Sequence, residues 1–123
     1  MKERGGGGKL VAVSSVSAIF GTPLQAHYAS SKAGLESLVR AYAVGLARYD
    51  VQVNAVQPGW IVTEATGAGH ANERFNEVIT RRTPARRWGE PEDMAGVFVY
   101  LASPASAFHT GDTLRVDGGY SIF

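Results

Sequence analysis

The amino-acid sequence predicts an α/β domain built around a parallel sheet. Short apolar runs rich in β-branched residues, the composition favoured in buried strands, recur at residues 9–15, 51–56 and 113–116. Longer segments with the periodicity of amphipathic helices lie between these runs. Strand and helix therefore alternate along the chain, which is the order that right-handed parallel crossovers produce. The 123 residues contain no internal repeat and no low-complexity linker.

The first predicted strand, residues 9–15, ends at Ser15. Open parallel sheets bind ligands at the carboxyl ends of their strands, so the Ser15 hydroxyl is a candidate ligand contact. A serine that only caps the strand end is the alternative. The glycine run at residues 5–8 precedes this strand. A phosphate cradle needs its glycines between a strand and a helix, so the run is interpreted as a flexible turn.

A loop punctuated by Gly21 and Pro23 leads into the longest predicted helix, residues 26–49. Its apolar residues recur in steps of three and four at Leu35, Val39, Tyr42, Leu46 and Tyr49. Tyr28 and Lys32 are one turn apart and project onto the same buried stripe. A lysine in that position costs free energy unless it has a partner or a task.

The spacing of Tyr28 and Lys32 suits proton transfer. A free phenol ionises poorly at neutral pH, and a lysine cation one turn away favours the phenolate. Acid–base catalysis by the phenol is one hypothesis for this pair. The alternatives are that Tyr28 packs as an ordinary aromatic residue and that Lys32 pairs with Glu36 at a spacing of four. The helical projection turns Glu36 toward solvent, which argues against the second alternative.

The second predicted strand, residues 51–56, is stopped by Pro58 and Gly59. Proline cannot donate to the ladder of a central strand, and glycine permits another group to approach the backbone closely. Residues 63–70 are rich in glycine, alanine and threonine, and are predicted to form a loop.

Two more helices are predicted before the last strand. The first covers residues 72–82, and its inward residues are expected to be Phe75, Val78 and Ile79. The second covers residues 91–102, where Pro91 suits the first turn and Glu92 and Asp93 favour the positive end of the helix. Its inward residues are expected to be Met94, Val97, Phe98 and Leu101.

Composition excludes several classes of function. The chain is 45% apolar and 19% charged with a net charge of +1, so nothing indicates attraction to nucleic acid or to anionic membranes. No apolar run reaches the length that spans a bilayer. The absence of cysteine excludes disulfides and thiolate chemistry, and it fits a cytoplasmic protein. His27, His70 and His109 lack the spacing of metal ligands, and no metal site is expected.

Five segments, taken in order, resemble the short-chain dehydrogenase/reductase family of the classical type. They are residues 14–18 (SSVSA), 28–34 (YASSKAG), 53–59 (VNAVQPG, followed by Thr63), 87–93 (RWGEPED) and 110–119 (TGDTLRVDGG). The family's glycine-rich cofactor turn, its Asn-Asn-Ala-Gly segment and its catalytic asparagine have no match. The resemblance therefore implies the C-terminal half of a Rossmann-type doubly wound parallel sheet, with about three strands and three to four helices. Residues 1–123 would be half of a single NAD(P)-binding domain.

The resemblance also implies a reaction, which is NAD(P)-dependent interconversion of an alcohol and a ketone. Tyr28 would exchange the proton, Ser15 would hold the substrate oxygen, and Lys32 would assist Tyr28 and bind the nicotinamide ribose. The cofactor-binding residues implied by the family are Tyr28, Lys32, Pro58, Gly59, Ile61 and Thr63. Neither NAD nor NADP is selected by these residues, and no particular substrate is specified.

A homo-oligomer is expected, as in the family, through the helices at residues 26–49 and 91–102. In the first of these helices, Ser30, Gly34, Ala41 and Gly45 line one face with small side chains. A rival interpretation is that the chain is a catalytically silent binding or dimerisation protein, because it lacks the glycine-rich turn.

Overall fold

The computed structural model describes residues 6–21 and 23–123, so Gly5 of the predicted glycine turn lies outside the described residues. These residues form a parallel sheet of three strands in the order β1-β2-β3. The strands are β1 (Gly8–Val13), β2 (Val51–Pro58) and β3 (Thr113–Val116). The predicted alternation of strands and helices is confirmed, and β3 has the predicted bounds.

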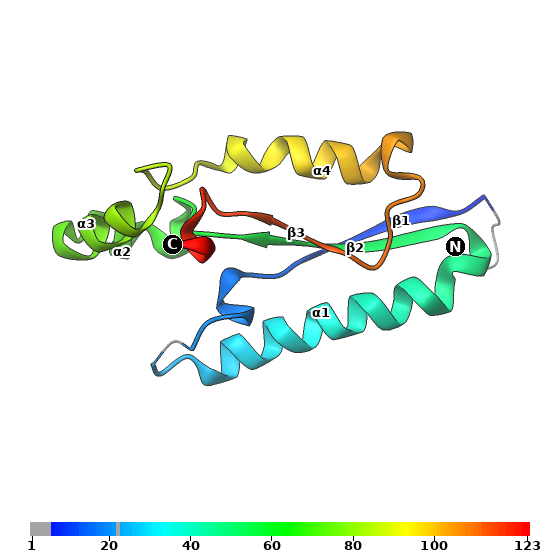
Figure 1. Ribbon diagram of the computed structural model, residues 1–123, viewed down its shortest axis with the longest axis horizontal. Coiled ribbons are helices and arrows are strands. Elements are labelled where there is room, and N and C mark those ends of the chain that lie inside the picture. Colours follow the sequence, from blue (N-terminus) through cyan, green and yellow to red (C-terminus); the bar gives the residue numbers. More distant parts are fainter. Residues whose placement is uncertain (1–5, 22) are drawn as a thin grey trace.

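Helices cover both faces of the sheet, as Figure 1 shows. The connection from β1 to β2 carries the long helix α1 (Ala26–Leu46) on one face, and the connection from β2 to β3 carries α4 (Ala95–Ala102) on the other. In β2 every residue from Val53 to Gln57 is buried, because neighbouring strands and both helical layers enclose it.

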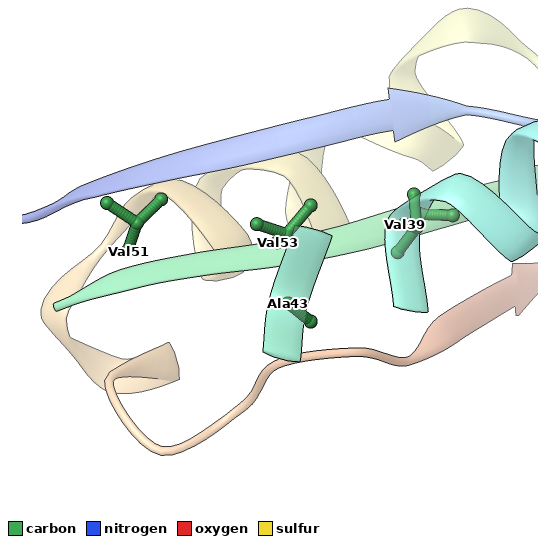
Figure 2. Close-up of a cluster of buried hydrophobic side chains, with 5 residues drawn as sticks. Val39, Ala43, Val51 and Val53 are labelled. Carbon is green, nitrogen blue, oxygen red and sulfur yellow. The ribbon is translucent and has the colours of Figure 1, made fainter. Parts of the chain in front are cut away.

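Helix α1 packs on β2 through two small apolar residues. Val39 and Ala43 belong to one buried cluster with Val51 and Val53 of the strand (Figure 2). The predicted apolar stripe is wrong at Tyr42, which is 55% exposed. A regular helix presents Val39 and Ala43 to a sheet together because they are four residues apart, and Tyr42 then lies at the side of this contact, where the sheet does not cover it. The predicted helix over residues 26–49 ends its last turn as a 3-10 segment, Ala47–Tyr49.

On the opposite face, α4 contributes Leu101 and the preceding 3-10 turn (Pro91–Met94) contributes Met94. Both side chains are buried against Val56 of β2, and Val97 and Phe98 pack at the edge of this group. The inward residues predicted for residues 91–102 are therefore confirmed. The first turn is 3-10 rather than α-helical, with Pro91 at its start as expected.

The segment predicted as a loop at residues 63–70 is partly helical. It contains a 3-10 turn (Glu64–Thr66) and the short helix α2 (Gly67–Ala71). Side-chain bonding stabilises the turn, because the Thr66 hydroxyl accepts from the Thr63 N–H at 2.9 Å and donates to the Ile61 carbonyl at 2.6 Å. Composition alone does not show such a local interaction.

Helix α3 (Glu73–Arg82) begins one residue after the predicted start, because Asn72 is its cap and accepts a hydrogen bond from the Phe75 N–H. Ile79 is buried, but Val78 is 56% exposed, so its predicted inward orientation is wrong. Figure 1 places α2 and α3 beyond the carboxyl ends of the strands. Aromatic contacts hold them there: His70 of α2 meets Trp88 at 5.1 Å, and Phe75 of α3 meets Trp60 at 5.2 Å, between ring centroids. Among the described residues, no helix is both long and apolar enough to cross a membrane.

Candidate active site

A cavity of about 510 Å³ opens at the carboxyl ends of β1 and β2, beside the start of α1. All of the site residues predicted from the sequence line this cavity: Ser15, Tyr28, Lys32, Pro58, Gly59, Ile61 and Thr63. The structure therefore brings together residues spread over almost fifty positions of the chain. Three apolar side chains from the other helical layer, which the sequence did not assign to the site, also line it: Pro91, Met94 and Phe98.

Ser15 lies directly beyond β1 and caps the 3-10 turn Val16–Ala18. Its Oγ accepts a hydrogen bond from the Ser17 N–H at 3.1 Å, so the capping role considered as an alternative is real. The same bond leaves the hydroxyl proton of Ser15 available to a ligand oxygen. Capping and ligand binding are thus compatible, because the cap uses the hydroxyl as an acceptor and a ligand oxygen would use it as a donor.

Lys32 joins α1 to the end of β1. Its Nζ donates to the Val13 carbonyl oxygen at 2.8 Å and lies 5.6 Å from the centroid of the Tyr28 ring. Because an ammonium carries three N–H donors, two remain for a ligand in the cavity. Lys32 does not form the alternative ion pair with Glu36 within the described part of the chain.

Tyr28 is 40% exposed, so its predicted position on the buried stripe is wrong. The first turn of α1 borders the cavity instead of packing on the sheet, and the ring lies in the cavity wall. Within residues 6–21 and 23–123, the Tyr28 hydroxyl makes no hydrogen bond in the structure. A free phenol beside a lysine ammonium is available for proton exchange with a bound molecule.

Gly59 is required by packing at the end of β2. A Cβ at this position would lie 2.6 Å from the Asp117 Cβ and 2.7 Å from its Cα. The Gly59 N–H also donates to the Val116 carbonyl at 2.9 Å. The close approach that the glycine was predicted to permit is therefore to the turn after β3.

Thr63 is tied to Thr66 by a hydroxyl–hydroxyl contact of 3.1 Å. The single hydroxyl proton of Thr66 goes to the Ile61 carbonyl at 2.6 Å, so Thr63 is the donor in this contact. The Thr63 oxygen, which also accepts from the Thr66 backbone in a capping box, keeps a lone pair for a ligand donor such as an amide NH₂.

The cavity fits the nicotinamide end of a dinucleotide. Apolar walls from Pro58, Ile61 and Met94 suit a flat ring, and the unused donors of Lys32 suit the hydroxyls of a ribose. Among residues 6–21 and 23–123, no strand is followed by a glycine-rich turn and a helix whose backbone N–H groups could bind a pyrophosphate. The residues present thus fit one end of the cofactor.

A second cavity of about 420 Å³ adjoins the first. Ser15, Tyr28 and Gly59 line both cavities, whereas Lys32 lines the first alone. The second cavity is lined in addition by Val16, Ser17, Gln25, His27 and Trp60. Ser15 and Tyr28 therefore lie at the boundary between two spaces, one with a lysine ammonium and one with several uncharged polar groups.

Beneath the site runs a set of polar contacts that the sequence did not predict. Glu36, expected to face solvent, instead accepts hydrogen bonds from Ser14 at 2.6 Å and from Gln57 at 2.7 Å. The helical projection failed for Glu36 because its partners, Ser14 directly after β1 and Gln57 in β2, lie about twenty residues away on either side. A glutamine within a buried strand, Gln57, is the one sequence signal that could have indicated a polar partner.

An ion pair supports the outer wall of the first cavity. The Arg87 guanidinium donates to Asp93 at 2.6 and 2.8 Å, just where the turn Pro91–Met94 begins. These two hydrogen bonds, with a third from the Glu90 N–H, hold the pKa of Asp93 far below its usual range. The same contact raises the pKa of Arg87. No group of three potential metal ligands occurs among the described residues.

Comparison with known proteins shows the family. A sequence family described as "Enoyl-(Acyl carrier protein) reductase" matches residues 1–121. The L-rhamnose 1-dehydrogenase (NAD(P)(+)) of Azotobacter vinelandii is 45% identical over 122 residues, which are 99% of this chain and 48% of that protein. The 5-keto-D-gluconate 5-reductase of Escherichia coli is 41% identical over 115 residues, which are 94% of this chain and 45% of that protein.

A solved structure agrees with these relatives. The gluconate 5-dehydrogenase from Burkholderia cenocepacia, in complex with NADP and tartrate, matches with a TM-score of 0.91 at 36% identity, over 94% of this chain and 45% of that one. The chain belongs to the short-chain dehydrogenase/reductase family of oxidoreductases, and its sheet is part of a Rossmann-type fold. It spans about half the length of the curated relatives it matches.

Proposed function

We propose that the protein catalyses NAD(P)-dependent hydride transfer between an alcohol and a ketone. The observation that carries this proposal is the position of Ser15 and Tyr28 between two cavities, with Lys32 on one side only. A reaction between two bound molecules needs a reacting centre that both can reach. The cavity with Lys32 fits the nicotinamide end, and the adjoining cavity is left for the substrate.

Each of the three residues has a separate task in this proposal. Ser15 donates its hydroxyl proton in a hydrogen bond to the substrate oxygen, which orients the carbon that exchanges hydride. Tyr28 takes the hydroxyl proton during oxidation and returns a proton to the oxygen during reduction. Lys32 favours the ionised form of Tyr28 and binds the ribose with its free donors. The bound nicotinamide supplies or accepts the hydride.

The substrate proposed for the second cavity is a polyhydroxylated sugar or sugar acid. Ser17, Gln25 and His27 offer hydrogen-bonding groups there, and Trp60 offers an apolar face. A chain of hydroxyl groups on a carbon skeleton needs both kinds of contact. Two of the relatives described above, an L-rhamnose 1-dehydrogenase and a 5-keto-D-gluconate 5-reductase, support this class.

A steady-state assay of the complete natural protein tests the function. NAD(P)H formation would be followed with L-rhamnose, D-gluconate and a simple aliphatic alcohol, each with NAD and with NADP. We expect turnover with at least one sugar or sugar acid and a lower kcat/KM for the aliphatic alcohol. Absence of turnover with every sugar and with the aliphatic alcohol would contradict the proposal. Turnover of the aliphatic alcohol alone would contradict only the substrate class.

A homo-oligomer formed through α1 remains part of the proposal. Val44 is 83% exposed, and a Cβ at Gly34 or Gly45 would meet no atom within 4 Å. This outer face combines an apolar side chain with small residues that permit close helix packing. Sedimentation of the complete protein before and after Val44→Glu tests it, and an unchanged oligomer would contradict this interface.

A further inference from the structure

Three polar side chains form a row across the ends of the strands, beneath the candidate site. Gln57 of β2 is paired in register with Arg115 of β3. On the other side, the Ser14 N–H donates to the Val56 carbonyl at 2.7 Å, which continues the β1–β2 register by one residue and places Ser14 opposite Gln57. Residues at one register position of a parallel sheet share a face. Ser14 and Gln57 are almost fully buried, with 3% and 1% exposed.

The carboxylate of Glu36, on α1, joins this row to the helix. Its Oε1 accepts from the Ser14 hydroxyl at 2.6 Å and from Gln57 Nε2 at 2.7 Å. The side-chain amide oxygen of Gln57, Oε1, in turn accepts from Arg115 Nε at 2.7 Å. These lengths are those of strong, charge-assisted hydrogen bonds. Through one oxygen atom, α1 is therefore bonded to the residue that follows β1 and to β2, and through Gln57 it is connected to β3.

Both ends of the Glu36 contact adjoin the proposed catalytic groups. Ser14 immediately precedes Ser15, and Glu36 follows Lys32 by one helical turn. The Ser14 hydroxyl also lies 3.4 Å from the Lys32 carbonyl, but its single proton belongs to the shorter contact with Glu36. Any shift of the end of β1 along α1 would break this contact and would move Ser15 relative to the helix.

We propose that Glu36 is a positioning residue, which fixes Ser15 relative to Tyr28 and Lys32. The inference rests on the proposed function, because it assumes that the three side chains react with one substrate. Catalysis by a hydroxyl donor and a phenol depends on their separation, and a displacement of about 1 Å is able to cost roughly 100-fold in rate. Glu36 provides what such a pair needs, which is a rigid connection between the two elements that carry it.

Two substitutions in the complete natural protein separate positioning from general stability. Glu36→Ala removes the acceptor and leaves two buried donors unpaired, and we expect kcat to fall about 10- to 100-fold per folded molecule. Glu36→Gln keeps an oxygen for both donors. The amide nitrogen of the new glutamine would take the place of Glu36 Oε2, which meets no donor among the described residues. This variant should therefore keep most of the parental kcat.

A second readout does not depend on activity. The Ser14 amide is protected by its bond to the Val56 carbonyl, and we expect its hydrogen exchange to accelerate in Glu36→Ala and to stay slow in Glu36→Gln. If Glu36→Ala does not fold, Ser14→Ala takes its place. This variant removes the Ser14 hydroxyl donor but keeps the Gln57 donor, and it should also lower kcat. Glu77→Ala is the matched control, because this glutamate is 70% exposed on α3, and it should change neither readout.

The outcomes are distinct. A folded Glu36→Ala with parental kcat, or with unchanged exchange at Ser14, would overturn the positioning role. So would a Glu36→Gln variant as impaired as Glu36→Ala, because the hydrogen bonds would then not be the cause. If the parent protein oxidised no alcohol, the proposed function would fail, and the exchange experiment alone would decide whether Glu36 holds the end of β1 against α1.

Discussion

The Lys32 ammonium donates a hydrogen bond to the Val13 carbonyl oxygen at 2.8 Å. Val13 is the last residue of β1 and Lys32 lies in the second turn of α1, so the bond crosses the floor of the cavity that both residues line. The lysine thus has a structural partner and free donors at the same time. This arrangement resolves why a lysine occurs on the inner side of a helix, where it would otherwise be costly.

Lys32→Met should impair cofactor binding as well as turnover. The substitution removes the donor to the Val13 carbonyl and the two donors left for a ribose. A hydrogen bond from a charged group contributes about 1.5–3 kcal/mol, so we expect the Kd for NADH or NADPH to rise roughly 10- to 100-fold. Fluorescence titration of the complete protein measures it. Lys9→Met, at the opposite end of β1, is the matched control, and a parental Kd in both variants would contradict the ribose contact.

Gly59→Ala should destabilise the protein. The new Cβ would lie 2.6 Å from the Asp117 Cβ and 2.7 Å from its Cα, and backbone atoms do not move aside cheaply. Overpacking of this kind costs about 1–3 kcal/mol of unfolding free energy. Urea denaturation measures the change.

Gly96→Ala is the control for that substitution. Gly96 lies within α4, and a Cβ there would meet no atom within 4 Å. Alanine should therefore stabilise the helix by about 0.4–1 kcal/mol. If the two alanine variants lost equal stability, contact with Asp117 would not be the cause.

Acid should destabilise the region around the Arg87–Asp93 pair. The pKa of Asp93 is held below its unfolded value near 3.8, so its contribution to stability is present above about pH 4 and is lost as the pH falls further. Asp93→Asn should make unfolding free energy less dependent on pH below this point. Denaturation curves between neutral and acidic pH measure the slope. Arg87→Met should reduce the same slope, and parental slopes in both variants would contradict the assignment.

The outer edge of β1 should promote association of the 123-residue chain on its own. β1 pairs with β2 alone within the described residues, and Leu10 and Val13 are 39% and 48% exposed. An unpaired apolar strand edge pairs readily with another chain. Sedimentation velocity at low micromolar concentration should show oligomers that Leu10→Lys reduces. Leu24→Lys, in an exposed loop, should leave them unchanged, and a monomeric parent chain would contradict the prediction.

The order of elements was predictable because it depends on local periodicity. The bounds of β3 and the inward residues of α4 follow from short apolar patterns, and the seven predicted site residues share a cavity because the family segments fix where they lie. Helix α2 was missed because its glycine- and alanine-rich sequence has no apolar period. The 3-10 turn before it is stabilised by side-chain hydrogen bonds of Thr66, which a sequence pattern does not show.

The polar row was not predictable for a different reason. A helical projection of α1 treats the sheet as one apolar surface, and it therefore turned Glu36 toward solvent. The true partners are Ser14, the residue after β1, and Gln57 in β2, and their alignment depends on the register between those two strands. Register is a property of the assembled sheet and is not contained in any one segment.

Turnover by Tyr28→Phe tests the proposed chemistry most directly. The substitution removes one hydroxyl that has no hydrogen-bond partner among the described residues, so the fold should be unaffected. In the complete natural protein we expect nearly all turnover to be lost while the Kd for NAD(P)H stays close to the parental value. A variant that kept more than about a tenth of the parental kcat, a barrier change below about 1.4 kcal/mol, would contradict the role of Tyr28 in proton exchange.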